Sequence, residues 1–253
     1  MSSATINSCK SVVKLAPNIH SEATSELLFG ESVLILEKGS QWCKVRSERD
    51  GYEGYVETNC CDVNGPASTH WVSTKATPVF EKPNIKSRVL KRLLFGSELT
   101  ATEAGTDSEF LSLHGGGYIW ALHCSKINVP LAAGMIDIAQ NNYLNAPYVW
   151  GGRSTDGCDC SGLLQMVARA TGVDLPRDSV DQEAAFCTDI EYESRATEDV
   201  VFWPGHVGLL KTPELILHST AHFMRCCIEP LQYVVDRAGA PSSIKRIQNN
   251  RVR

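Results

Sequence analysis

Short segments of alternating character dominate the first half of the chain. Residues 32–37 are β-branched and apolar, and a glycine at position 39 follows them. Apolar and polar side chains then alternate over 42–46, which is the period of a half-buried strand. An Asp-Gly pair at 50–51 precedes a third such segment, 52–56, and this dipeptide is a strong signal for a tight turn between strands. Short strands joined by tight turns predict a small β-barrel.

This pattern occurs twice along the chain. Four matches have the same separation, and they are 17–19 with 83–85, Ser21 with Ser87, 27–30 with 93–96, and 51–52 with 117–118. A common separation over so many positions is typical of an internal duplication. We therefore predict two small barrels, over residues 1–65 and 66–127.

The hydrophobic period changes after Pro130. Apolar side chains between 131 and 144 recur at helical spacing. The glycine-broken stretch 146–152 cannot continue that helix. A second run of helical period covers 163–172, and its last residue, Gly172, is of the type that ends helices. Two helices separated by a glycine-rich loop are predicted.

Three apolar segments separated by turn residues come next, and we expect them to form antiparallel strands. They cover 199–203, 206–210 and 215–219. If the turn between the last two pivots on Thr212, His206 lies opposite His218. Helices and strands together predict an α+β domain over 128–253, behind the two barrels.

The composition restricts the classes of function. The chain has 253 residues, of which 43% are hydrophobic and 21% charged, as in ordinary globular proteins. A formal net charge of −5 offers no electrostatic footprint for nucleic acid, so no nucleic-acid partner is predicted. The chain lacks an apolar run of about 18 residues, so no membrane-spanning helix and no membrane partner is predicted.

The N-terminus and the cysteines bear on the compartment. Residues 1–10 lack a basic segment followed by an apolar one, which predicts no secretory signal. Ten cysteines occur, at positions 9, 43, 60, 61, 124, 158, 160, 187, 226 and 227. Because two pairs are adjacent and the chain is long enough for a hydrophobic core, we expect most of them to be reduced. These features favour the cytoplasm, and a monomer is favoured.

Cys160 is the candidate nucleophile. It precedes the second predicted helix, whose first backbone N–H groups favour an anion and are expected to lower the pKa of the thiol from about 8.5. A thiolate also needs an imidazole base and an oxyanion site. His206 and His218 are suited to be the base and its orienting partner, the part that Asp plays in a Ser-His-Asp triad. This chemistry needs no metal and no organic cofactor.

The segments around these residues resemble the NlpC/p60 family of papain-like cysteine peptidases. The matching segments are 148–152 (Tyr-Val-Trp-Gly-Gly), 159–162 (Asp-Cys-Ser-Gly), 176–179 (Pro-Arg-Asp-Ser), 199–203, 206–208 and 217–219. The resemblance implies that Cys160 is the nucleophile, His206 the general base and His218 its orienting residue, with Tyr148 at the oxyanion site. The two barrels resemble bacterial SH3-like domains, the second less closely because Phe110 replaces a tryptophan.

Family members with SH3-like domains and an Arg-Asp-Ser motif resemble γ-D-glutamyl–diamino acid endopeptidases. The resemblance implies a murein peptide substrate, cut before diaminopimelate or lysine and carrying a free N-terminal amine. The implied substrate-binding residues are Asp159, Ser161, Asp178, Ser179, Trp150, Glu31 and Tyr52. A cationic amine in a closed pocket needs carboxylate partners, which agrees with this set.

Three other interpretations compete with this hypothesis. Cys158 and Cys160 could be zinc ligands together with the two histidines, although a one-residue spacing is unusual for zinc. The chain could be a non-catalytic wall-binding protein in which the barrels bind peptidoglycan. It could also be an amidase or acyltransferase on a papain-like core, but the circularly permuted relatives of that kind place the histidine before the cysteine.

Overall fold

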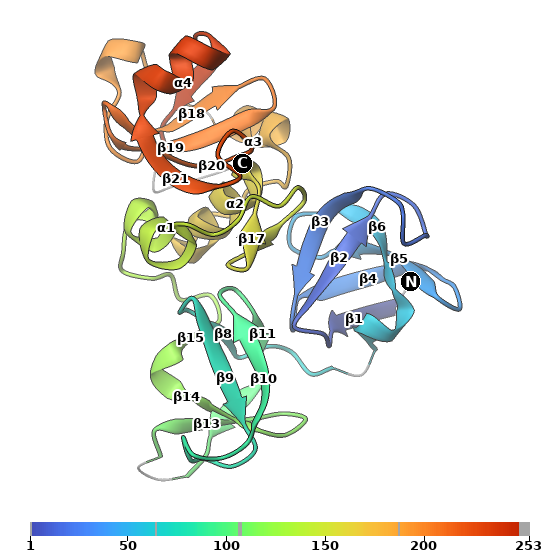
Figure 1. Cartoon of the computed structure of the whole chain (residues 1–253). Helices are drawn as coiled ribbons and strands as arrows, with labels where there is room; N and C mark the ends of the chain where they lie inside the picture. Colours follow the sequence, from blue (N-terminus) through green and yellow to red (C-terminus); the bar gives the residue numbers. More distant parts are fainter. Residues whose placement is uncertain (1, 64, 106–107, 187, 248–253) are drawn as a thin grey trace. The chain divides into compact units, whose positions relative to one another are not determined.

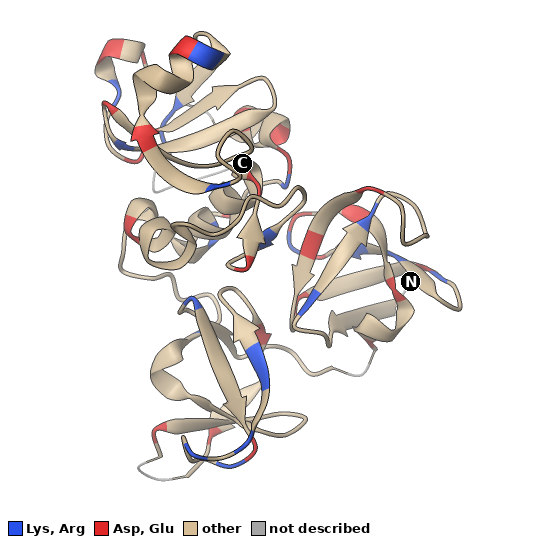
Figure 2. Cartoon of the chain, viewed as in Figure 1, with Lys and Arg blue, Asp and Glu red and all other residues tan. Residues whose placement is uncertain are grey.

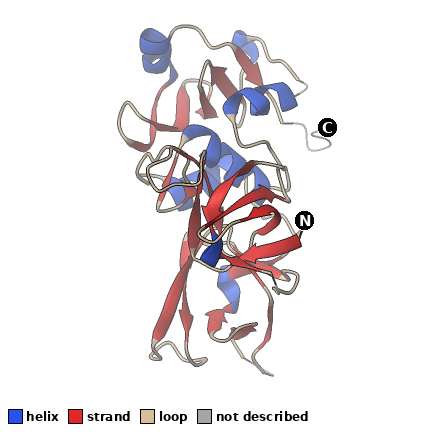
Figure 3. Ribbon diagram, turned by 90° about the vertical axis from the view of Figure 1, so that its right-hand side faces the viewer, coloured by secondary structure: helices blue, strands red, loops and turns tan. Residues whose placement is uncertain are grey.

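The computed structural model describes residues 2–63, 65–105, 108–186 and 188–247, and Figure 1 traces the chain. It divides into two compact units, Met1–Val129 and Pro130–Arg253. Strands dominate the first unit, whereas the second combines helices with an antiparallel sheet (Figure 3). This mixture confirms the α+β class. Acidic and basic residues occur in both units (Figure 2).

The first barrel of unit one is a seven-stranded sheet with the order β3-β2-β6-β5-β4-β1-β7. Its strands are β1 (Ser2–Ile6), β2 (Lys10–Lys14), β3 (Ala23–Leu28), β4 (Ser32–Lys38), β5 (Trp42–Ser47), β6 (Glu53–Glu57) and β7 (Cys61–Asp62), with a 3-10 turn at Thr58–Cys60. Alternate residues point inward, as in β5, where Cys43 and Val45 are buried. They join one core with residues such as Ile6 and Val33.

The second barrel has its own core, around Leu93 and Ile119. Its strands are β8 (His70–Val72), β9 (Ala76–Phe80), β10 (Val89–Leu94), β11 (Glu98–Leu99), β12 (Ala101–Glu103), β13 (Phe110–Leu113), β14 (Tyr118–Trp120) and β15 (Cys124–Lys126), with a 3-10 turn at Ala121–His123. They form two sheets, β10-β9-β14-β13-β12 and β11-β8-β15. Phe110, which replaces the tryptophan of the first copy, packs edge-on against Trp120.

The repeated Asn and Ser residues brace the same loop in both barrels. In the first barrel, Asn18 Oδ1 accepts a hydrogen bond from the His20 amide, and Ser21 Oγ accepts one from the Ala16 amide. In the second barrel, Asn84 and Ser87 accept the equivalent bonds from the amides of Lys86 and Lys82. Side chains that satisfy backbone donors in a turn explain why these positions are alike in the two copies.

The two barrels touch at Gly30 and Glu98. The Glu98 amide donates a 2.7 Å hydrogen bond to the Phe29 carbonyl, and the Glu98 carboxylate accepts from Arg49 Nη2 at 2.8 Å. Gly30 has a φ of +80°, and a Cβ placed there would lie 2.0 Å from the Glu98 carbonyl oxygen. A side chain at position 30 is therefore excluded by the neighbouring backbone as well as by the conformation.

The second unit packs helices on both faces of a five-stranded antiparallel sheet. Its elements are α1 (Met135–Tyr143), β16 (Arg153–Ser154), β17 (Gly157–Cys158), α2 (Cys160–Ala170), α3 (Ser179–Ala185), a 3-10 turn (Tyr192–Ser194), β18 (Val200–Trp203), β19 (His206–Thr212), β20 (Leu215–Thr220), β21 (Arg225–Pro230), α4 (Leu231–Ala238) and β22 (Ser243–Lys245). The sheet has the order β21-β20-β19-β18-β22. Helix α2 contacts β19 and β20, and α4 packs against Val201 and Leu210. Every residue of β18 is buried, because both faces are covered.

The helix boundaries differ from the predicted ones at one end. The first helix begins at Met135, and not at 131, because Gly134 is extended and the Leu131 amide donates to the Ala170 carbonyl. The second helix ends as predicted: Gly172 has a φ of +88°, a left-handed conformation that favours glycine. No helix among the described residues has the length and apolar character needed to cross a bilayer.

Replacing Gly30 by alanine should destabilise the first unit. Gly51 also has a positive φ, +74°, but nothing lies within 4 Å of a Cβ at that position. Gly51→Ala therefore measures the conformational cost alone, about 1–2 kcal/mol. Gly30→Ala should cost about 1–3 kcal/mol more, as in other overpacked sites. Equal losses in chemical denaturation would show that the barrels do not meet at this residue.

Candidate active site

The start of α2 is fixed by a carboxylate. Asp159 is the N-cap residue, and its Oδ1 accepts a 2.7 Å hydrogen bond from the Gly162 amide. Its Oδ2 accepts another at 2.9 Å from the Gly151 amide, in the preceding loop. A Cβ at Gly162 would lie 2.2 Å from the Gly152 carbonyl oxygen, so the helix can pack against that loop only with glycine there. Cys160, the predicted nucleophile, is thereby held at the first turn of α2.

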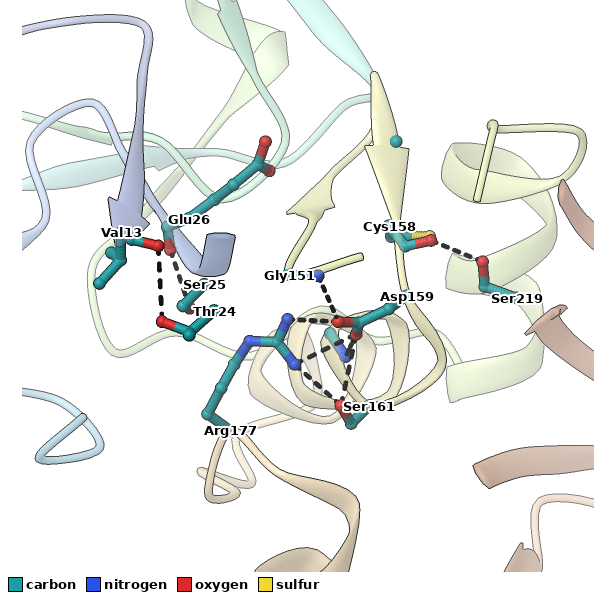
Figure 4. A network of polar contacts seen from close by, with 12 residues as sticks. Val13, Thr24, Ser25, Glu26, Gly151, Cys158, Asp159, Ser161, Arg177 and Ser219 are labelled. Carbon is teal, nitrogen blue, oxygen red and sulfur yellow. Dashed lines mark hydrogen bonds and ion pairs between the residues drawn. The ribbon is translucent and has the colours of Figure 1, made fainter. Parts of the chain in front are cut away.

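Arg177 completes this arrangement from 18 residues downstream in the chain. Its guanidinium donates to both carboxylate oxygens of Asp159, at 3.1 and 2.6 Å, and to Ser161 Oγ at 2.8 Å. Ser161 in turn donates to Asp159 Oδ1 at 3.3 Å. Figure 4 shows the three side chains around the helix start. The ion pair is buried, with only 1% of the Arg177 side chain exposed.

Two residues of the predicted substrate-binding set already have internal partners. The carboxylate of Asp159 accepts hydrogen bonds from four residues, and Ser161 is hydrogen-bonded to both Asp159 and Arg177. Asp178 is exposed and caps α3 by position, with Ser179 half-buried beside it. The sequence motif included Arg177, but we did not predict its contact with Asp159. Contact of the predicted set with a substrate stays a prediction.

The two histidines meet at the open end of the β19–β20 hairpin, away from its turn, but not in the predicted register. The register pairs Leu209 with Leu217, and it shifts between Leu210 and Thr212. His206 therefore does not lie opposite His218, and the predicted register is wrong by two residues. An even shift keeps both side chains on one face of the sheet, so they interact diagonally. Their Nε2 and Nδ1 atoms are 2.8 Å apart.

A glutamate that was not predicted from the sequence extends the hydrogen bonding of the two histidines. Glu229 Oε1 lies 2.8 Å from His218 Nε2. On its other side, Glu229 forms an ion pair with Arg237 of α4. Cys227 pairs directly with His218 across β20 and β21, so the period of two places Glu229 on the same face. Extending the predicted hairpin by one more strand would have revealed Glu229.

The hydrogen bonds fix where the ring protons lie. An ionised carboxylate can only accept, so His218 donates from Nε2 to Glu229. Its Nδ1 then accepts, and the donor must be Nε2 of His206. The remaining nitrogen of His206, Nδ1, carries a lone pair. Its neighbour Val207 places a backbone N–H on the thiol of Cys160, which locates the thiol beside this histidine.

The pKa values show that the site rests in neutral form. Burial lowers the pKa of His206 to about 3 and that of His218 to about 4. Burial, followed by the charge of Asp159, raises the pKa of Cys160 to about 11, and the amides of Val207 and Ser161 offset this only in part. The expected lowering at the helix start is thus wrong for this structure, because the capping carboxylate and burial outweigh the helix N-terminus.

Tyr148 lies near the thiol of Cys160. It forms a bridge with Cys158, and its amide donates to the Met224 carbonyl. Burial and the proximity of Cys160 and Asp159 raise the pKa of its phenol to about 12. The phenol therefore keeps its proton and can donate a hydrogen bond. Trp150, two residues later, is 60% exposed.

Glu31 and Tyr52 belong to the first unit. Glu31 is buried in the turn between β3 and β4, where its Oε2 accepts a 2.9 Å hydrogen bond from the Leu28 amide. Tyr52 follows the turn after β5, and its amide donates to Asp50 Oδ1. The predicted contact of these two residues with a substrate stays a prediction.

All nine cysteines in the described part of the chain are free thiols. Cys187 lies outside the described residues. Cys158, the other half of the zinc alternative, is fully buried, and its carbonyl accepts a 2.6 Å hydrogen bond from Ser219 Oγ (Figure 4). Among the described residues, the one group of three metal-ligating side chains is His218, Cys227 and Glu229, which contains neither Cys158 nor Cys160.

Comparison with known proteins places these features in a family. Residues 145–234, which contain Cys160, both histidines and Glu229, match the NlpC/P60 family. This chain carries an NlpC/P60 peptidase domain. Residues 15–59 match the bacterial dipeptidyl-peptidase Sh3 domain, which agrees with the predicted resemblance of the first barrel.

Relatives that resemble this chain over most of its length have similar names. It is 28% identical to dipeptidyl-peptidase 6 of Lysinibacillus sphaericus, over 81% of this chain and 82% of the relative. It is 25% identical to the γ-D-glutamyl-L-lysine dipeptidyl-peptidase of Bacillus subtilis, over 77% and 71% of the two chains. The crystal structure of an NlpC/P60 family protein from Bacillus cereus covers 97% of this chain and 99% of its own, with a TM-score of 0.83 and 19% identity, and therefore shares the fold.

Replacing Arg177 by methionine should destabilise the NlpC/P60 unit by about 3–5 kcal/mol, because it leaves the buried Asp159 charge without its partner. Arg246→Met is the matched control: Arg246 also pairs with a buried aspartate, Asp199, but 43% of its side chain is exposed. Water can replace that guanidinium, so the loss should be smaller. Chemical denaturation measures both, and equal losses would contradict the assigned role of the Arg177 pair.

Acidification should weaken the same unit through its histidines. Their folded pKa values, about 3 and 4, lie below the unfolded value of about 6.5. The unfolded state therefore binds protons first, and stability present above pH 6.5 is lost below it, by up to about 1.4 kcal/mol per pH unit for each histidine. His206→Gln should reduce this slope between about pH 6.5 and 4.5 in urea denaturation. The exposed His20→Gln should leave it unchanged, and an unaltered slope in His206→Gln would contradict the prediction.

Proposed function

We propose that this chain is a cysteine endopeptidase that hydrolyses the γ-D-glutamyl–diamino acid amide bond of murein peptides. The observation that carries the proposal is the hydrogen-bonded line from Glu229 through His218 to His206, which ends beside Cys160. It is the arrangement that a thiol nucleophile requires. The names of the relatives support the class of bond that is cut.

The line of hydrogen bonds favours His206 Nδ1 as the base. It takes the proton of Cys160 as the thiolate attacks the carbonyl carbon of the scissile amide. The resulting imidazolium donates from Nε2 to His218, which donates to the carboxylate of Glu229. Because His218 and Glu229 are buried and His206 is half-buried, the negative charge of Glu229 stabilises the positive charge on this relay more strongly than it would in water. Cys160 and His206, which are both neutral at rest, thus become ionised during the attack on the substrate.

The remaining steps use the same groups. The tetrahedral oxyanion accepts hydrogen bonds from the Tyr148 phenol and from backbone N–H groups at the start of α2. His206 then gives its proton to the leaving amine of the diamino acid, and a thioester to Cys160 remains. Water, activated by His206, hydrolyses the thioester and releases the γ-D-glutamyl product with a free thiol.

We assign the recognition of the peptide to residues of both units. Those of the second unit are Asp159, Ser161, Asp178, Ser179 and Trp150, and those of the first unit are Glu31 and Tyr52. The carboxylates suit the free α-amine of a released peptide that begins with L-Ala. Since Asp159 and Ser161 are bound to Arg177, their part includes holding the start of α2 in place.

Purified protein should release L-Ala-γ-D-Glu from L-Ala-γ-D-Glu-diaminopimelate, and the lysine peptide should be tested beside it. Cys160→Ala should abolish release, because no other group can form the thioester. Cys60→Ala, which removes a partly exposed thiol of the first barrel, should keep full activity. Equal turnover by Cys160→Ala and the unmodified chain would exclude the mechanism.

Glu229→Gln should lower kcat/KM by about 10²-fold or more, by analogy with the loss of the carboxylate in a catalytic triad. The charge of Glu229 raises the pKa of His206. Its removal should therefore move the acidic limb of the kcat/KM profile to lower pH, which a merely structural defect does not do. Glu214→Gln, in the exposed hairpin turn, is the control. An unshifted acidic limb would show that Glu229 does not act on the base.

A further inference from the structure

A cluster of soft and borderline metal ligands lies behind the histidine pair. His218 Nε2, Cys227 Sγ and a carboxylate oxygen of Glu229 all lie within 4.8 Å of one another. All three residues are buried, with exposed fractions of 0%, 6% and 7%. They share one face of the sheet, because Cys227 pairs with His218 across β20 and β21 and Glu229 follows two residues later.

From this cluster we infer that His218, Cys227 and Glu229 form an inhibitory zinc site in the unit that carries the proposed peptidase centre. A tetrahedral zinc ion with bonds of about 2.0–2.3 Å places its ligand atoms about 3.3–3.8 Å apart. His218 and Glu229 already approach to 2.8 Å, so small side-chain movements are enough to admit the ion. Three protein ligands leave the fourth position for water.

The charges of the cluster agree with a divalent ion. Zinc binding removes one proton from Cys227, and the thiolate and the Glu229 carboxylate together balance the two positive charges of the ion. The imidazole of His218 remains neutral. A thiolate and an imidazole select zinc against calcium and magnesium, which prefer oxygen ligands.

The Glu229 carboxylate already forms an ion pair with a cationic side chain. Arg237 pairs with Glu229, but 27% of the Arg237 side chain is exposed, so the guanidinium can turn to water when a metal ion takes its place. Because Arg237 competes with zinc for Glu229, zinc binds more weakly than at a structural site, as a reversible inhibitor should.

Metal binding moves the ring protons of both histidines to the opposite nitrogen atoms, and the proposed mechanism depends on where these protons lie. Nε2 of His218 cannot hold zinc and a proton together, so its ring proton moves to Nδ1. Nδ1 then donates to Nε2 of His206, which must become an acceptor. The ring proton of His206 is thereby moved to Nδ1, the atom that has to accept the proton of Cys160. The base is blocked without a ligand on the thiol itself. This step rests on the proposed function, whereas zinc binding does not.

Binding is tested in the full-length Cys160→Ala variant, so that the reactive thiol cannot be a ligand. Isothermal titration with zinc should reveal one site. Adding Cys227→Ala should weaken zinc affinity by more than about tenfold. Loss of a residue that only hydrogen-bonds to a metal ligand already costs about tenfold, so loss of a ligand should cost more. Cys226→Ala is the matched control, because Cys226 is an adjacent buried thiol that points to the other face of the sheet. With cobalt in place of zinc, thiolate-to-metal absorption should appear and should vanish only with Cys227→Ala.

Equal zinc affinity with and without Cys227, or loss of the cobalt band with Cys226→Ala instead, would overturn the site. Circular dichroism checks that each variant is folded. In the enzyme with Cys160 intact, Cys227→Ala should keep its peptidase activity and need more than about tenfold higher zinc for inhibition. Unchanged sensitivity would mean that zinc acts at Cys160, which overturns the inhibitory role. Absence of peptidase activity in every sample would instead contradict the proposed function, and the binding result would still decide the site.

Discussion

The buried ion pair between Asp159 and Arg177 is the constraint on which the rest of the site depends. One carboxylate caps α2, ties down the Gly151 loop and receives a guanidinium from the segment before α3. Three stretches of chain are thereby joined at the residue next to Cys160. A charge buried in this way is stabilising only while all its partners are present, so the start of the helix has one arrangement. The position of the thiol relative to β19 follows from that arrangement.

The same carboxylate explains why the thiol is protonated at rest. Helix starts attract anions, but here the Asp159 carboxylate already binds the Gly162 amide in the first turn. A second negative charge one residue away is unfavourable, and burial adds to the cost. The positive charge that favours a thiolate therefore has to come from His206, through a relay that ends in Glu229. Positioning and activation are thus separate tasks, performed by two different carboxylates in one domain.

Much of this could be predicted from the sequence, since strand period and helix period differ and glycine marks the turns. The α+β class, the hairpin and the proximity of His206 to His218 all followed from such local patterns. The register did not, because the turn lies at Pro213 and Glu214, where Thr212 pairs with Leu215, and not at Thr212. A bulge between Leu210 and Thr212 then shifts the pairing back by one residue, and neither feature leaves a trace in the alternation of residues. Nor did the contacts of Arg177 and Glu229, which depend on pairing between distant segments. The direction of the pKa of Cys160 was missed for the same reason: burial is a property of the folded chain.

The diagonal contact of the two histidines limits how this hairpin can change in evolution. Moving β20 along β19 by two residues returns every side chain to the same face, so paired insertions or deletions in the turn preserve the facing of His218. A single inserted residue turns His218 toward the opposite face and separates it from Glu229 as well as His206. Turn lengths among active relatives should therefore differ in steps of two, unless a new bulge restores the parity.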